Sequence, residues 1–75
     1  MTEFTRVTMN LTDRDVRNTE KVSQLFHTRN KAEAVSAALG ITSSLGEMIR
    51  GGKELVLRSK NGDLERVLIP GLDDA

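Results

Sequence analysis

The chain has 75 residues, no cysteine and one histidine, and its eleven Lys and Arg residues balance eleven Asp and Glu residues. Below about 70–80 residues, a single core rarely supplies more than ~3–5 kcal/mol of stability. The lack of cysteine excludes disulfides, and it disfavours structural zinc, whose ligands are mostly Cys and His. We therefore expect one small domain that is stabilised by oligomerisation, with two chains sharing one core.

The residue inventory also narrows the class of function. It contains no Ser-His-Asp, Cys-His or metal-binding constellation and no Gly-rich phosphate loop, so we expect neither an enzyme nor a cofactor. His27 is interpreted as a turn residue. No apolar run approaches the ~18 residues of a membrane span, and no signal peptide is recognisable. The expected location is therefore the cytoplasm, without a membrane partner.

Charge is distributed unevenly along the chain. Residues 1–31 carry six basic and four acidic side chains, whereas residues 32–75 carry five basic and seven acidic ones. The first part is therefore +2 and the second −2. This asymmetry suggests that a polyanionic partner would meet the N-terminal half.

Residues 5–11 alternate between polar and apolar side chains. This period of two predicts a strand with one buried and one solvated face. A lone strand cannot satisfy its own backbone groups, so its partner is either a C-terminal hairpin, described below, or the same strand of a second chain. The apolar face consists of Val7, Met9 and Leu11, and the polar face consists of Arg6, Thr8 and Asn10.

A first helix is predicted over residues 13–26. Thr12 has the position of its N-cap, and Asp13 and Asp15 lie in the first turn, where the helix dipole favours anions. The apolar positions of this segment are few, so the helix must depend on tertiary packing.

A second helix is predicted over residues 31–50. Asn30 has the position of its N-cap, and Glu33 follows at the capping-box spacing. Gly51-Gly52 ends the helix, and Gly40 could permit a close helix contact. One helix face is predicted to be apolar; it carries Val35, Ala38, Leu39, Thr42, Leu45 and Ile49.

A β-hairpin is predicted over residues 54–69, because Asn61-Gly62 separates two β-rich segments and suits a type I′ turn. In this register Arg58 lies opposite Glu65, and Lys60 lies opposite Asp63. Pro70-Gly71 ends the second strand, and residues 73–75 are expected to fray. The face expected to be buried carries Leu55, Leu57, Leu64 and Leu68.

The order of these elements carries a resemblance to a known family. The alternating strand, the Thr12 cap and the segment Asn30-Lys31-Ala32-Glu33-Ala34-Val35 make residues 5–49 resemble ribbon-helix-helix DNA-binding proteins of the Arc and MetJ type. The resemblance covers about two thirds of the chain. It implies a mainly α fold with short β, in which two strand-helix-helix chains form an intertwined homodimer. Residues 1–50 would form this domain, and residues 51–75 would add the hairpin and a short acidic tail.

The resemblance also implies site residues. The solvated ribbon face would enter the major groove of double-stranded DNA, with Arg6, Thr8 and Asn10 reading bases. The start of the second helix would bind phosphate. The residues implied there are Arg29, Asn30, Lys31 and Ala32, and the implied dimer core contains Val7, Met9, Leu11, Val35, Leu39 and Leu45.

The leading hypothesis is therefore a small homodimeric transcriptional regulator of a bacterial type, such as a repressor. The alternative is an antitoxin-like or other interaction module, whose C-terminal hairpin binds a protein partner while DNA binding is weak or absent. Zero net charge predicts only modest non-specific attraction to phosphate. A hairpin with an exposed edge would favour the alternative.

Overall fold

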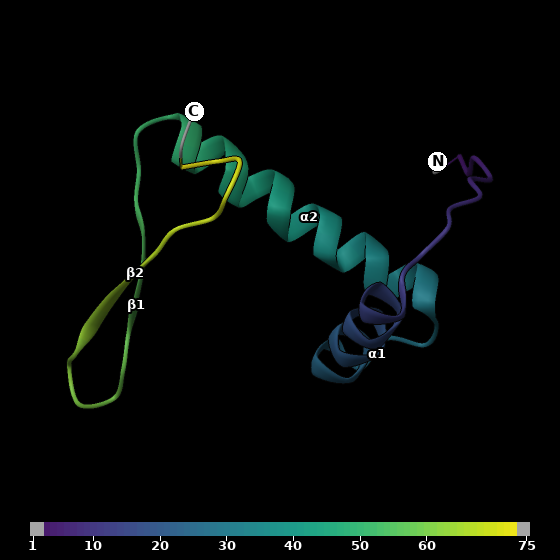
Figure 1. The fold of residues 1–75 in the computed structure, drawn as a ribbon, viewed down its shortest axis with the longest axis horizontal. Coiled ribbons are helices and arrows are strands. Elements are labelled where there is room, and N and C mark those ends of the chain that lie inside the picture. Colours follow the sequence, from purple (N-terminus) through teal and green to yellow (C-terminus); the bar gives the residue numbers. More distant parts are fainter. Residues whose placement is uncertain (1–2, 74–75) are drawn as a thin grey trace. The chain divides into compact units, whose positions relative to one another are not determined.

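The structure, a computed structural model, describes residues 3–73. Its elements are α1 (Asp13–Phe26), α2 (Lys31–Arg50), β1 (Leu55–Arg58) and β2 (Leu64–Val67), and the two strands form one antiparallel sheet (Figure 1). The predicted class, mainly α with short β, is confirmed. Both helices also have the bounds that their caps predicted.

A reciprocal pair of hydrogen bonds fixes the start of α1. Thr12 is extended, with φ −71° and ψ 165°, and its hydroxyl accepts the N–H of Asp15 at 3.1 Å. The Asp15 carboxylate in turn accepts the N–H of Thr12 at 3.4 Å. The predicted N-cap is confirmed, and Asp15 completes a capping box in addition to its favourable interaction with the helix dipole.

The turn between the helices is held by its own polar groups. His27 ends α1 in the left-handed region, with φ 53°, and its N–H bonds to the carbonyl of Ser23. The hydroxyls of Ser23 and Thr28 lie 2.6 Å apart, and the Thr28 hydroxyl donates to the carbonyl of Asn30 at 3.1 Å. His27 is therefore a turn residue, as predicted.

α2 ends in a Schellman motif. The N–H of Gly52 bonds to the carbonyl of Ile49 at 3.0 Å, and the N–H of Lys53 bonds to the carbonyl of Met48 at 3.0 Å. Gly52 has φ +101°, a conformation that glycine adopts without steric cost. The predicted stop at the two glycines is confirmed.

The strand predicted over residues 5–11 is not formed in this chain. Residues 3–12 contain neither helix nor strand, and β1 pairs with β2 alone. A strand exists only where a second backbone satisfies its N–H and carbonyl groups. Both partners that the sequence left open for this strand therefore stay predictions.

The register of the hairpin differs from the prediction by one residue. Arg58 pairs with Leu64, and Leu57 pairs with Glu65. Such a shift moves side chains to the other face of a sheet. Leu55 and Leu57 therefore share one face with Val67, whereas Leu64 lies on the opposite face with Val56. The prediction of one buried leucine face was wrong.

The turn explains this shift. The N–H of Gly62 bonds to the carbonyl of Ser59 at 3.0 Å, and the N–H of Ser59 bonds to the carbonyl of Asp63 at 2.9 Å. Gly62 has φ +94°, whereas His27 is the one non-glycine residue with positive φ in the described chain. The predicted type I′ turn would need positive φ at Asn61 too, so it is wrong. The loop has three residues and ends in a left-handed glycine.

The chain divides into two compact units, Met1–Val35 and Ser36–Ala75, with the division inside α2. In the first unit Ala34 is fully buried, and it is the one buried hydrophobic residue of the described chain. In the second unit Leu55, Val67, Ile69 and Leu72 are half-buried. The predicted functional division after residue 50 coincides with the end of α2 and stays a prediction.

Two glycines should respond to alanine in opposite directions. Gly62→Ala should destabilise the chain by about 1–2 kcal/mol, because an L-residue resists the left-handed conformation. Gly40→Ala should stabilise it by about 1 kcal/mol, because its Cβ would meet nothing within 4 Å and alanine favours the helix. Thermal unfolding at equal chain concentration measures both effects. Destabilisation by Gly40→Ala would instead reveal a close contact at that position.

Candidate nucleic-acid interface

The three predicted base-reading residues precede α1. Arg6, Thr8 and Asn10 are exposed, and no hydrogen bond or ion pair holds them in the described chain. Their side chains offer a guanidinium fork, a hydroxyl and an amide, the groups that recognise base edges in the major groove. All three groups are exposed and available to a partner.

The apolar residues between them are exposed as well. Val7 is 67% exposed, Met9 59% and Leu11 47%. In a folded strand with one buried face these side chains would be covered. Their exposure shows that one chain alone does not bury the predicted apolar face.

The predicted phosphate-binding residues lie at the start of α2. Asn30 accepts the N–H of Glu33 at 2.9 Å through its side-chain oxygen, so the predicted N-cap is confirmed. The carboxylate of Glu33, however, accepts the N–H of Arg29 at 3.0 Å. The capping-box spacing predicted that this carboxylate would instead accept the N–H of Asn30, so that detail of the prediction was wrong.

Arg29 is held by the same carboxylate. Its Nε lies 3.0 Å, and its Nη2 2.8 Å, from Oε2 of Glu33. The hydrogen bond from the guanidinium, assisted by the backbone N–H of Arg29, lowers the pKa of Glu33, and the same bond raises the pKa of Arg29. Glu33 thus neutralises part of the charge that Arg29 would offer to a phosphate. The sequence signal that could have revealed this pair is the i, i+4 spacing of opposite charges.

Lys31 and Ala32 occupy the first two positions of α2, and both are exposed. Their N–H groups belong to the first turn of a 20-residue helix, where no carbonyl of the helix can accept them. The helix dipole makes this end favourable for an anion. Lys31 adds a full positive charge at this end of the helix, and the phosphate-binding role of residues 30–32 stays a prediction.

The predicted dimer-core residues of α2 are incompletely covered. Val35 and Leu45 are half-buried, and Leu39 is 65% exposed. Within the chain these residues do not form a closed core. The role of these three residues in a dimer core therefore stays a prediction.

The C-terminal turn adds a feature that the sequence reasoning missed. The Asp73 carboxylate accepts the N–H of Ile69 at 2.5 Å, and the Ile69 carbonyl accepts the N–H groups of Leu72 and Asp73. Arg50 donates to the carbonyl of Gly71 at 3.2 Å. Asp73 is therefore ordered rather than frayed as expected, while residues 74 and 75 lie outside the described chain.

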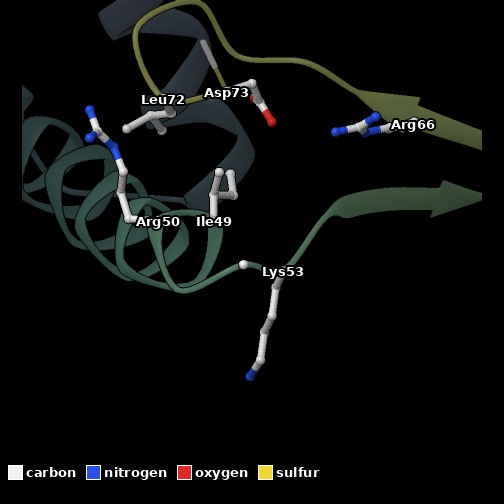
Figure 2. Close-up of a pocket in the computed structure, with 7 residues that line it drawn as sticks. Ile49, Arg50, Lys53, Arg66, Leu72 and Asp73 are labelled. Carbon is white, nitrogen blue, oxygen red and sulfur yellow. The ribbon is translucent and has the colours of Figure 1, made fainter. Parts of the chain in front are cut away.

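This turn and the end of α2 enclose a pocket of about 360 Å³ (Figure 2). Arg50, Lys53 and Arg66 contribute positive charge to its lining, and Asp73 contributes negative charge. Arg66 is engaged by Glu54 at 3.4 Å, and the ammonium of Lys53 points away from the pocket in Figure 2. The cations do not converge, so the pocket is not a built anion site.

Residues 3–73 contain neither a metal-binding cluster nor a helix that could span a membrane. No group of three or more His, Cys, Asp or Glu residues is arranged to hold a metal ion. Neither described helix combines the length and apolar character needed to cross a membrane.

Comparison of the chain with protein families, with curated proteins and with solved structures gave no match.

The Arg29–Glu33 pair gives a testable pH dependence. Because the pKa of Glu33 is lowered in the folded chain, its stabilising contribution is present above the ordinary glutamate pKa and is lost as pH falls through the lowered value. An NMR titration of the Glu33 carboxyl should give a midpoint below the ordinary value, and Arg29→Gln should return it toward that value. An unchanged midpoint in Arg29→Gln would contradict the assignment.

Proposed function

We propose that the chain is one subunit of a ribbon-helix-helix homodimer that binds double-stranded DNA in the cytoplasm and regulates transcription. The observation that carries the proposal is the uncovered alternating segment. Val7, Met9 and Leu11 recur at every second position, remain exposed, and lead directly into the capped start of α1. The proposed function is binding, without catalysis or a cofactor.

A second copy of the segment is the partner that fits. In a symmetric antiparallel pair, residues directly opposite each other lie on the same face, so one residue must lie opposite its own copy. With Met9 on the axis, Val7 lies opposite Leu11 of the second copy. This register collects all three apolar side chains of each chain on one face and leaves Thr8 and Asn10 opposite each other on the other.

The composition of α2 supports helices that pack beneath such a ribbon. A helix that is apolar over more than half its circumference needs cover on more than one side. Counting 100° per residue, α2 carries two adjacent apolar stripes that together exceed half the circumference. The first contains Val35, Ala38, Leu39, Leu45 and Ile49, and the second contains Ala34, Ala37, Ile41 and Met48.

The proposed DNA contacts are divided by chemistry. Arg6 can take guanine O6 and N7 bidentately, Asn10 can take adenine N6 and N7, and Thr8 can bond to either base or touch a thymine methyl. The first turn of α2 and Lys31 would hold a phosphate. Arg29 would reach phosphate only by leaving Glu33, so its contribution should be small.

A second candidate function is supported by the hairpin. Leu57 is 56% exposed, Leu64 70% and Leu68 63%. Exposed leucines on both faces of a sheet are typical of a surface that another protein covers. We therefore keep an antitoxin-like role, with a protein partner at the hairpin, as the alternative.

NMR titration of labelled chain with duplex DNA tests the proposed function. Shifts at Arg6, Thr8, Asn10 and residues 30–32 that weaken as salt is raised are expected, because phosphate contacts release counterions. A stable dimer without such shifts would refute DNA binding and leave the hairpin as the surface to test.

The ribbon makes a prediction about dimer stability. Val7→Lys should dissociate the dimer, because it places a charge on the face that the helices cover. Thr8→Lys adds the same charge to the solvated face and should leave the dimer intact. Sedimentation equilibrium measures both variants. Equal effects of the two changes would contradict a ribbon with one buried face.

Arg6 makes a prediction about specificity. On a duplex selected from a random library, Arg6→Ala should weaken binding by about 1–3 kcal/mol and relax one base position. Arg17→Ala removes the same charge from the exposed surface of α1. It should therefore weaken only the salt-dependent, non-specific attraction to DNA phosphates. Fluorescence anisotropy at two salt concentrations separates these effects. Equal losses in the two variants would argue against base reading by Arg6.

A further inference from the structure

We propose that the outer edge of β1 pairs antiparallel with β1 of a second copy of this chain, with Val56 opposite Val56 of that copy. The two hairpins would then form one four-stranded sheet in the order β2-β1-β1-β2. This pairing depends neither on DNA binding nor on the ribbon of residues 5–11.

The outer edge of β1 is unpaired in the described chain, because β1 pairs with β2 alone. The N–H of Ser59 bonds to Asp63 on the β2 side. N–H and carbonyl groups alternate in direction along a strand, so those of Ser59, Leu57 and Leu55 point toward β2. Those of Arg58, Val56 and Glu54 consequently point outward. The edge offers three donors and three acceptors to a second backbone.

Symmetry restricts how this edge can pair with itself. In a two-fold antiparallel pair one residue must face its own copy. When Val56 occupies the axis, the outward-facing groups of Val56 meet those of its copy, and those of Glu54 meet those of the copy's Arg58. The register therefore allows six backbone hydrogen bonds, two at each of three pairs.

The side chains suit this register. Glu54, whose carboxylate contacts Arg66 of its own chain at 3.4 Å, also lies opposite Arg58 of the second copy, at both ends of the contact. Cross-strand pairs of opposite charge are favourable. Leu55 lies opposite Leu57 of the second copy at the closer, non-hydrogen-bonded positions. Val56, which is 45% exposed in one chain, meets its own copy. Each charge thus meets its opposite, and each apolar residue meets another apolar residue.

Neighbouring registers are worse. With Leu57 on the axis, Val56 would lie opposite Arg58, and Leu55 would lie opposite Ser59 of the second copy. With Leu55 on the axis, Glu54 would lie opposite Val56. Both registers place charged groups beside apolar ones. Arg58, which has no ion-pair partner within the described chain, gains one only when Val56 lies on the axis.

The absence of cysteine permits a direct test by single-cysteine oxidation. In Val56→Cys the two Cα atoms would lie about 5.5 Å apart, within disulfide range. In Leu57→Cys the same atoms would lie about 8 Å apart, since the residues are displaced by two positions along the strand, which is beyond that range. Leu64→Cys places the thiol on β2, at a position more exposed than Val56. It measures how fast a disulfide forms by random collision of two chains.

We expect Val56→Cys to form a disulfide-linked dimer about tenfold or more faster than either control, because pairing gives the thiols a millimolar effective concentration. A rate no higher than that of Leu64→Cys would overturn the proposal. Circular dichroism of each variant establishes that the compared chains are equally folded.

Charge reversal tests the register independently. In the Val56→Cys background, Arg58→Glu would place like charges opposite each other, and so would Glu54→Arg, so neither chain alone should link rapidly. When the two chains are unfolded, mixed and refolded together, opposite charges return at both ends, and fast linking should return as mixed dimers. Equal linking by each chain alone and by the mixture would overturn the proposed register.

Discussion

The rest of this structure depends on one constraint, which is that its apolar side chains need a second surface to bury them. One chain buries Ala34 and leaves side chains as large as Met9, Leu39 and Leu64 exposed in the described residues. Hydrophobic burial is the dominant favourable contribution to folding, and one small residue cannot supply it. The alternating segment, the broadly apolar α2 and the two-faced hairpin each need a second surface. The proposed self-association meets this need at both the ribbon and the hairpin.

The helices were predictable from the sequence because their ends are decided locally. The Thr12 cap and the Asn30 cap each act on an N–H group three residues later, and the Schellman motif at Gly52 spans residues 48–53. Such signals need no knowledge of distant contacts. The location of the candidate phosphate site at the start of α2 follows from the same signals. The capping-box spacing of Asn30 and Glu33 did not by itself show that Glu33 also binds Arg29.

Predictions that required a choice between similar local arrangements were less successful. Asn-Gly suits both a two-residue and a three-residue loop. In the longer loop formed here, the side-chain oxygen of Asn61 accepts the N–H of Asp63. That choice shifted the register and separated Leu64 from Leu57. Asp73 escaped prediction because its carboxylate caps a turn that only the folded chain reveals. A strand at residues 5–11 does not follow from local signals, since it exists only where a second backbone pairs with it.

The small buried core also bears on how subunits could be replaced. In the proposed dimer, a departing chain would carry little folded structure of its own, so exchange between dimers would pass through unfolding. Many obligate homodimers have no stable folded monomer. Chains made at the same time and place would then pair with each other and stay paired. Mixed dimers from two related genes would form during synthesis and seldom afterwards.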